Sequence, residues 1–231
     1  MTEGAAVILP ALNEANSVEK VVKGFLNEGA RVVVVDNGST DGTGQVAQRA
    51  GAEVVTEITR GYGNACLAGL RYLKQNPPKN VVFADCDGTL NPVEIKSLLS
   101  PIESEKADIV LGRRCRVETG ALPSHQFYGN KITCFLLKAL YRLTISDIPP
   151  YRAVRWSFLT QLPLSEGTYG FPIETVALAA RKGGRFVEVD VDYRVRSGGK
   201  SKVAGSLLGS LQAGLTMIGL TILIRVRSPD V

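Results

Sequence analysis

The sequence is poor in the residues that build zinc sites and disulfide frameworks. Its 231 residues include four cysteines, none of them in a C-x-x-C pair, and one histidine, His125. Because no partner stands at metal-ligand spacing from His125, the composition argues against a zinc site. Scattered cysteines are typical of a reducing compartment, and no basic segment precedes the first apolar run, as a secretory signal would require. We therefore expect a cytoplasmic protein, either free or peripheral on the cytoplasmic face of a membrane.

A strong charge bias is also absent. The net charge is +5, charged residues make up 21% of the chain and apolar residues 45%. These proportions are typical of a globular protein rather than a disordered chain. A mild positive charge fits an anionic substrate or an anionic membrane surface. Because no RNP, zinc-finger or heptad pattern accompanies this charge, we expect no nucleic-acid partner.

What the sequence does contain is an alternation of short apolar runs and helical patterns. Strands are predicted over residues 6–9, 31–36, 53–56, 80–84, 107–112 and 185–193. Helices are predicted over residues 18–26, 44–50, 62–74, 127–141 and 174–181, with a short one starting at Pro92 and a loop over 146–152. This alternation predicts a single α/β domain built on a doubly wound, mostly parallel sheet.

Polar clusters follow three of the predicted strands. Residues 10–14 follow the first strand, Asp36 and Asn37 end the second, and Asp85 and Asp87 follow the fourth. In doubly wound sheets, ligands bind beyond the carboxyl ends of the strands. The sequence therefore predicts one convergent site at this edge of the sheet.

The pair Asp85 and Asp87 is the strongest candidate for a metal site. Two carboxylates that are two residues apart on an extended segment point to the same side. Magnesium or manganese is usually held by one or two such carboxylates together with substrate phosphates. The same residues also fit a solvated turn, because Asp87-Gly88 is good turn chemistry.

Basic residues gather in a glycine-rich segment over 194–202, which includes Arg196 and Lys202. Cations beside glycines predict a loop that closes over phosphate, although a solvated surface is the ordinary role of such a run. We place the α/β domain over 1–202. The uncharged segment 203–224 predicts a helical tail, 203–231, which packs on the core or rests on a membrane surface rather than spanning the bilayer. Gly205-x-x-x-Gly209 within it permits a homodimer contact.

Taken together, eight short stretches resemble the family 2 glycosyltransferases of GT-A fold. The resemblance is closest to the branch that makes polyprenyl-phosphate and dolichyl-phosphate sugars. The stretches are weak alone but run in family order, at residues 9–14, 35–43, 61–65, 85–87, 112–114, 147 with 151–152, 169–174 and 201–202. The resemblance implies an inverting enzyme that moves a hexose from UDP-hexose or GDP-hexose to a lipid phosphate.

The resemblance also assigns roles to individual residues. It implies a nucleotide-sugar pocket formed by Pro10, Asn13, Glu14, Asp36, Asn37, Gly63, Asp85, Arg196 and Lys202. It implies that Asp87, Glu174 and Arg114 lie at the reacting centre, and that Asp85 and Asp87 are ligands of Mg²⁺ or Mn²⁺.

Three positions depart from the pattern of the polyprenyl-phosphate branch. Asn37 replaces a second aspartate, Thr89 replaces a metal-binding glutamine of some relatives, and Phe127 replaces an arginine expected at the acceptor phosphate. Two alternatives therefore stay open. One is transfer to a soluble or glycolipid hydroxyl, which needs a general base such as Glu174 or Asp147. The other is a catalytically silent protein that binds a sugar nucleotide.

Overall fold

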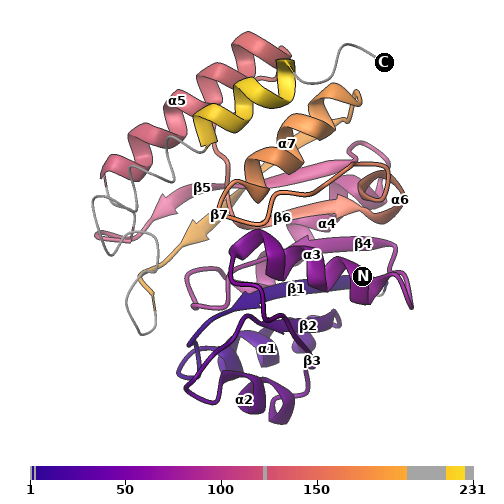
Figure 1. Cartoon of the computed structure of the whole chain (residues 1–231), viewed down its shortest axis with the longest axis vertical. Coiled ribbons are helices and arrows are strands. Elements are labelled where there is room, and N and C mark those ends of the chain that lie inside the picture. The colour runs from indigo at the N-terminus through magenta and orange to yellow at the C-terminus, as the bar shows by residue number, and fades with distance from the viewer. Residues whose placement is uncertain (1, 3, 122–123, 197–216, 227–231) are drawn as a thin grey trace.

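The computed structural model describes residues 2, 4–121, 124–196 and 217–226, and for residues 124–126 the backbone alone. Its centre is a seven-stranded sheet in the order β3-β2-β1-β4-β6-β5-β7 (Figure 1). The strands are β1 (Ala5–Ala11), β2 (Arg31–Asp36), β3 (Glu53–Thr56), β4 (Asn80–Phe83), β5 (Ile109–Val117), β6 (Arg152–Arg155) and β7 (Phe186–Tyr193). Four of the six strand pairs are parallel, so the predicted mostly parallel α/β sheet is confirmed.

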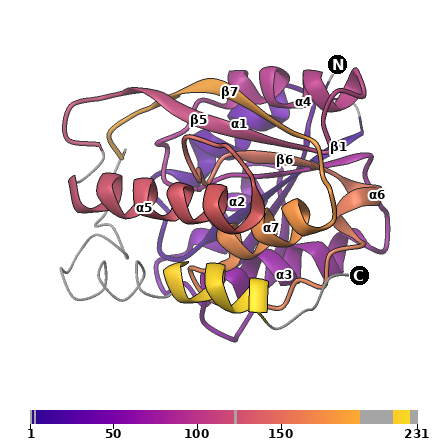
Figure 2. The same ribbon diagram turned by 90° about the horizontal axis from the view of Figure 1, so that it is seen from above.

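Helices cover both faces of this sheet. They are α1 (Val18–Asn27), α2 (Thr43–Arg49), α3 (Tyr62–Leu73), the 3₁₀ turn η1 (Pro92–Glu94), α4 (Ile95–Glu103), α5 (Ser124–Tyr141), α6 (Trp156–Leu159) and α7 (Phe171–Arg181). Side chains of α1, α2 and α4 share one core with the sheet, and those of α3, α5 and α7 share the other. Figure 2 shows α1 and α4 on one side of the sheet and α3 and α7 on the other. A sheet covered on both faces needs strands that are apolar on both faces. Residues 32–35 of β2, four consecutive valines, are all buried and meet this requirement.

The structure corrects the prediction around residue 152. We expected a loop over 146–152 and no strand after it, whereas β6 begins at Arg152 and lies antiparallel between β4 and β5. This strand has only four residues with arginine at both ends, so it shows no apolar periodicity from which it could be predicted. The short helix α6 that follows was missed for the same reason.

Smaller differences concern the ends of elements. β5 runs to Val117, beyond the predicted end at Gly112, and it pairs with β7 from Ile109 to Val117 (Figure 1). The helix expected over 174–181 begins three residues earlier, at Phe171, because Pro172 fits the first turn of a helix. Glu174 therefore lies inside the first turn rather than at its start.

Part of the predicted tail lies outside the described residues, including Gly205, Gly209 and the proposed boundary at 202. Residues 217–226 form a helix beside α5 and α7 (Figures 1 and 2). Tyr141 Oη donates a hydrogen bond to the carbonyl of Thr221 at 2.6 Å, and Arg181 Nη1 donates to that of Ile224 at 3.0 Å. In the part of the chain that the structure describes, no helix is both long enough and apolar enough to cross a bilayer.

Candidate active site

The loops that follow β1, β2 and β4 meet at the carboxyl edge of the sheet. β1 lies between β2 and β4, so the ends of these three strands are neighbours. Asn13, in the left-handed region at φ 53°, ties the first loop to the second. Its backbone N–H donates to Ser39 Oγ at 3.0 Å, and its side-chain oxygen accepts from the N–H of Thr40 at 2.8 Å. The sequence prediction placed these polar clusters together, and the strand order explains why they meet.

Glu14 and Asp87 are joined by one arginine from the far end of the chain. Arg196 Nη1 donates to Glu14 Oε1 at 2.8 Å, and Arg196 Nη2 lies 2.9 Å from Asp87 Oδ2. The side chains of Glu14 and Asp87 are only 9% and 6% exposed, and that of Arg196 is 23% exposed. Because these side chains are so little exposed, a guanidinium that bridges the two carboxylates offsets much of the cost of burying their charge.

Asp87 is oriented by its own turn. Its Oδ1 accepts hydrogen bonds from the N–H of Thr89 at 3.0 Å and from Thr89 Oγ1 at 2.7 Å. Oδ2 is left facing Arg196. Thr89, which the sequence marked only as a departure from the family, therefore acts on Asp87 directly.

Asp85 lies two residues before Asp87 and shares its surroundings. Burial, and after it the charge of Asp87, raises the pKa of the Asp85 carboxyl to about 7, against the opposing effect of Arg196, Arg152 and Arg114. Because burial and a neighbouring negative charge disfavour the ionised form of this carboxyl, a nearby cation would stabilise that form strongly.

The carboxylates fit a cation that substrate phosphates also bind, rather than one enclosed by the protein. Within the described residues no three histidine, cysteine, aspartate or glutamate side chains surround a common point. Asp85 and Asp87 nevertheless offer the oxygen donors that Mg²⁺ and Mn²⁺ prefer, and one or two carboxylates suffice when phosphates complete the shell. The guanidinium already present between Glu14 and Asp87 shows that the site accommodates positive charge.

Arg114, predicted at the reacting centre, is held by Asp147. Its Nε donates to Asp147 Oδ2 at 2.9 Å and its Nη2 to Asp147 Oδ1 at 2.6 Å, a bidentate pair. The backbone N–H of Arg114 donates to the same carboxylate at 2.9 Å. Burial raises the pKa of Asp147, but the hydrogen bonds and charge of Arg114 outweigh it, so the pKa lies below its usual value. The guanidinium also lies 5.3 Å from the ring centroid of Tyr193.

Glu174 and Gly63 hold the same segment, residues 165–168, from two sides. The Glu174 carboxylate accepts from the N–H groups of Ser165 at 3.1 Å and Glu166 at 2.9 Å. On the other side the N–H of Gly63 donates to the carbonyl of Thr168 at 3.0 Å. A Cβ at Gly63 would lie 2.0 Å from the carbonyl oxygen of Glu166, so only glycine permits this approach. Glu174 was predicted at the reacting centre and Gly63 in the nucleotide-sugar pocket. In the structure both residues position this segment.

The remaining predicted pocket residues lie on the loops after β1 and β2. Pro10 is half-buried near the end of β1. Asp36 Oδ1 accepts from the N–H of Ser39 at 2.8 Å. The amide of Asn37 bonds the backbone instead: Nδ2 donates to the carbonyls of Glu57 and Thr59 at 2.9 and 2.8 Å, and Oδ1 accepts from the N–H of Gly61 at 2.8 Å. Lys202 lies outside the described residues.

Sequence reasoning gave no role to Arg152, although it was part of the resemblance. Arg152 is fully buried, with its guanidinium carbon 4.5 Å from the ring centroid of Phe83 and 5.5 Å from that of Phe171. Among the residues that the structure describes, its buried Nε and Nη2 have no hydrogen-bond partner, and neither has the buried hydroxyl of Tyr62 nearby. The only signal in the sequence was an arginine at the start of a short apolar run.

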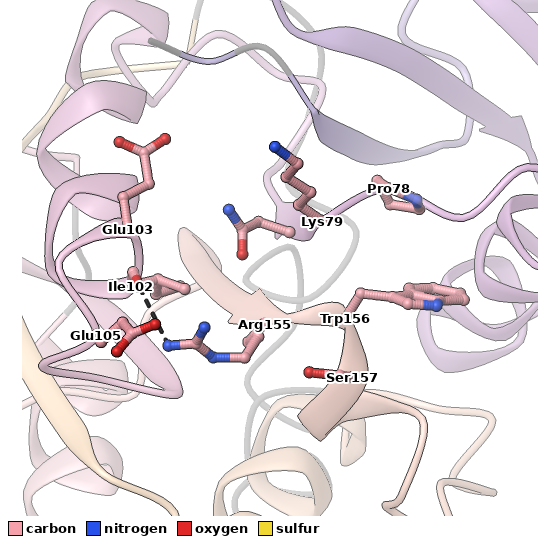
Figure 3. Close-up of a pocket in the computed structure, with 9 residues that line it drawn as sticks. Pro78, Lys79, Ile102, Glu103, Glu105, Arg155, Trp156 and Ser157 are labelled. Atoms are coloured by element: carbon pink, nitrogen blue, oxygen red, sulfur yellow. Dashed lines mark hydrogen bonds between the residues drawn. The ribbon is translucent and has the colours of Figure 1, made fainter.

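A cavity of about 650 Å³ lies at the opposite edge of the sheet (Figure 3). It is lined by Asn80, the first residue of β4, and by Arg155, the last residue of the antiparallel β6, so it is remote from Asp85 beyond the other end of β4. The Arg155 guanidinium donates to the carbonyls of Ile102 and Ala107 at 3.1 and 3.2 Å. This cavity belongs to a different part of the molecule from the acidic site.

The fold, with acidic side chains at the carboxyl edge of its sheet, defines the GT-A class of sugar transferases. The chain belongs to glycosyl transferase family 2, whose profile matches residues 6–160. An uncharacterized glycosyltransferase of Mycobacterium bovis is 39% identical over 211 residues, which cover 91% of this chain and 94% of that protein. The undecaprenyl-phosphate mannosyltransferase of Micrococcus luteus is 32% identical over 230 residues, covering 92% and 93%.

A solved structure shows the same fold with its ligands. Glucosyl-3-phosphoglycerate synthase from Mycobacterium tuberculosis, in complex with Mn²⁺, uridine diphosphate and glucosyl-3-phosphoglycerate, matches with a TM-score of 0.75 at 25% identity. The match covers 98% of this chain and 81% of that one. The comparisons confirm the predicted family, the predicted GT-A fold and the resemblance to the polyprenyl-phosphate branch, so the chain is a glycosyltransferase.

Proposed function

We propose that this glycosyltransferase uses a divalent metal to move a hexose from a UDP- or GDP-hexose to polyprenyl phosphate, with inversion at the anomeric carbon. The observation that carries the proposal is the convergence of Glu14, Asp85 and Asp87 with Arg196 at the carboxyl edge of the sheet. Support comes from the Mn²⁺ and uridine diphosphate of the solved relative and from the undecaprenyl-phosphate acceptor named for the Micrococcus enzyme.

On the donor side, Asp85 and Asp87 would hold Mg²⁺ or Mn²⁺ together with the donor diphosphate. A bound divalent ion supplies neutralisation of the charge that develops on the leaving diphosphate. Thr89 fixes the Asp87 carboxylate through two hydrogen bonds. The loops carrying Asn13 and Asp36 would receive the nucleoside, because both lie beside these carboxylates at the strand ends.

On the acceptor side, the structure favours a nucleophile that needs no protein base. A phosphate monoester is already anionic near neutral pH, whereas a hydroxyl must lose a proton during attack. The two candidate bases are both engaged: Asp147 pairs with Arg114, and Glu174 binds the backbone of Ser165 and Glu166. Arg114 holds the pKa of the Asp147 carboxyl below its usual value, which makes Asp147 a poor proton acceptor.

The proposed step balances without a further reactant. An oxygen of the acceptor phosphate forms a bond to the anomeric carbon, and the bond from that carbon to the donor diphosphate breaks. The nucleoside diphosphate leaves with the bonding electron pair, and attack from the opposite side inverts the configuration. Arg114, Arg196 and Lys202 would hold the two phosphate groups near each other, because cations are needed to bring two anions together.

One observation favours the hydroxyl acceptor as the second candidate. Phe127, at the position where the family pattern has an arginine, is 46% exposed on α5 and offers no cation for a phosphate. Lys131, one turn further along α5, places its ammonium 5.5 Å from the Phe127 ring centroid. If the acceptor is a phosphate, Lys131 would replace the missing arginine as the cation on α5.

The test offers polyprenyl phosphate and the matching polyprenol side by side, with UDP-glucose and GDP-mannose as donors and Mn²⁺ or Mg²⁺ present. We expect transfer to the phosphate only, no transfer in excess chelator, and a large loss in Lys131→Ala with a smaller loss in the surface control Lys138→Ala. Equal transfer to the alcohol would establish the second candidate. Donor binding without transfer to any acceptor would leave a silent sugar-nucleotide-binding protein.

A further inference from the structure

Arg196 differs from the other arginines of the site because it contacts two carboxylates that belong to separate loops. Arg114 is fixed by Asp147, and Arg152 lies buried between two phenylalanine rings. Arg196 instead bridges Glu14 and Asp87, which come from the loops after β1 and β4 and lie 182 and 109 positions away in the chain. It therefore holds together the acidic residues to which the metal and the donor would bind.

The geometry makes Arg196 and a metal ion competitors for one oxygen. Asp87 Oδ1 accepts two hydrogen bonds from Thr89 and is oriented toward its own turn. Asp87 Oδ2 is the oxygen that Arg196 contacts, at 2.9 Å. Because Oδ1 already accepts two hydrogen bonds, a divalent ion that binds Asp87 would take Oδ2, where its charge repels the guanidinium at short range.

We propose that Arg196 is a displaceable positioning cation, which occupies Asp87 before the donor arrives and leaves it when the divalent ion and the diphosphate bind. This inference rests on the proposed metal site at Asp85 and Asp87. Once released, the guanidinium is beside the incoming diphosphate, which matches its planar, bidentate geometry. Release of Arg196 from Glu14 and Asp87 is thus coupled to binding of the diphosphate, which the released guanidinium then contacts.

Competition has a measurable consequence in the protein without nucleotide. If Arg196 occupies Asp87 in about nine of ten molecules, the apparent metal affinity is about tenfold weaker than the intrinsic one. Removing the guanidinium should therefore tighten metal binding, even though the same change should slow transfer. A residue that served as a metal-site support would give the opposite result.

The first experiment titrates the full chain with Mn²⁺, without nucleotide, and measures free Mn²⁺ by electron paramagnetic resonance. We expect the dissociation constant to fall about tenfold in Arg196→Gln. Arg196→Lys should fall in between, because an ammonium keeps the charge but cannot span both carboxylates as the guanidinium fork does. The matched control is Arg116→Gln, since Arg116 is 69% exposed and pairs with Asp192 and Glu94 instead; it should bind Mn²⁺ like the wild type.

The second experiment watches Arg196 itself by NMR of ¹⁵N-labelled arginine side chains, with its Nε–H signal assigned from its loss in Arg196→Lys. Addition of diamagnetic Mg²⁺ should shift this signal with the midpoint of metal binding and leave the Arg114 signal in place. An Arg196 signal that stays unchanged while metal binds, or an unchanged affinity in Arg196→Gln, overturns the inference and leaves the proposed function standing. Absence of metal binding in both wild type and Arg196→Gln overturns the metal site and the inference together.

Discussion

The first half of the chain, up to the end of α4, and the second half, from β5 onward, contribute to the candidate site by different means. In the first half, two aspartates that lie at the ends of β2 and β4 are oriented by neighbours two or three residues on: Asp87 by Thr89 and Asp36 by Ser39. In the second half, arginines are placed by partners far away in the chain. Arg114 pairs with Asp147, 33 residues on, and Arg196 with Glu14, 182 residues back.

This difference shows how acidic side chains, proposed to face the donor, and basic side chains, proposed to face the acceptor, can be held in one site. Local turns can fix carboxylates without neutralising them, whereas a half-buried guanidinium needs a specific counter-charge. The first half can therefore be built from strand-end loops alone, as in any doubly wound sheet. The second half depends on the antiparallel insertion of β6 between β4 and β5 and on the long β5–β7 ladder.

The largest effect is expected from the local carboxylate Asp87. Asp87→Asn should keep the fold but lower the rate of transfer by about a thousandfold, because a cation that neutralises the leaving group is worth several kcal/mol. The rate is measured with saturating donor and metal, and the fold by circular dichroism. Asp190→Asn, an exposed aspartate paired with Arg113, is the control and should keep most of the activity. More than a tenth of the wild-type rate in Asp87→Asn would contradict the role of this carboxylate.

The second prediction concerns the long-range pairs of the second half. Asp147→Asn should lower the free energy of unfolding by about 3 kcal/mol, because it leaves the guanidinium of Arg114 buried with its charge uncompensated. The side chains of this pair are only 11% and 7% exposed. Asp190→Asn breaks a pair whose side chains are 42% and 45% exposed and should cost less than about 1 kcal/mol. Urea denaturation of both variants measures the difference, and equal losses would show that burial is not what distinguishes the pairs.

The sequence was enough to predict that the polar ends of β1, β2 and β4 lie together, because this information is local. Strand ends followed by Asn13, Asp36, Asp85 and Asp87 can be recognised in the sequence, and parallel strands bring their carboxyl ends to one edge. The family resemblance added Arg114 and Arg196, but not what they bind. Their partners depend on register and on strand insertion, and neither leaves a periodic pattern in a four-residue strand such as β6.

The same reasoning explains where residue roles were missed. Gly63 was assigned to the pocket from a motif, while the structure shows a backbone approach from residues 166–168 that no local pattern encodes. Arg152 looked like an ordinary charged residue at a loop end, yet it is fully buried. Burial of a charge is decided by tertiary packing, so the sequence could name this arginine but not its environment.

The third prediction tests that backbone approach with two glycines. Gly63→Ala should lower the free energy of unfolding by about 2 kcal/mol, because its Cβ would lie 2.0 Å from the Glu166 carbonyl oxygen and force the segment to move. Gly129→Ala is the matched control. It lies inside α5 with open space around its Cβ, and should gain about 0.5 to 1 kcal/mol from helix propensity. Thermal denaturation of the two variants should shift in opposite directions, and a neutral Gly63→Ala would mean that the segment yields easily.

The smallest effect is expected at the other end of the β5–β7 ladder, where a long-range pair has no part in the site. Arg185 donates to both carboxylate oxygens of Asp108, and these hydrogen bonds, opposed by burial, lower the pKa of Asp108 to about 2. A lowered pKa means that the folded protein binds fewer protons than the unfolded chain between about pH 4 and pH 2. The stability from this pair is therefore complete above pH 4 and is lost as the pH falls toward 2.

Asp108→Asn should accordingly cost about 1 kcal/mol at pH 6, since Arg185 is 52% exposed and solvent screens the pair. The cost should shrink as the pH falls from 4 to 3, because Asp108 in the unfolded wild-type chain then takes up a proton, which stabilises the unfolded state relative to the folded one. Urea denaturation at pH 6, 4 and 3 measures it, and transfer activity at pH 7 should stay within about twofold of the wild type. A cost that does not change with pH would show that the hydrogen-bond geometry matters here rather than the charge. A loss of activity would show that this edge of the sheet communicates with the acidic site at the other.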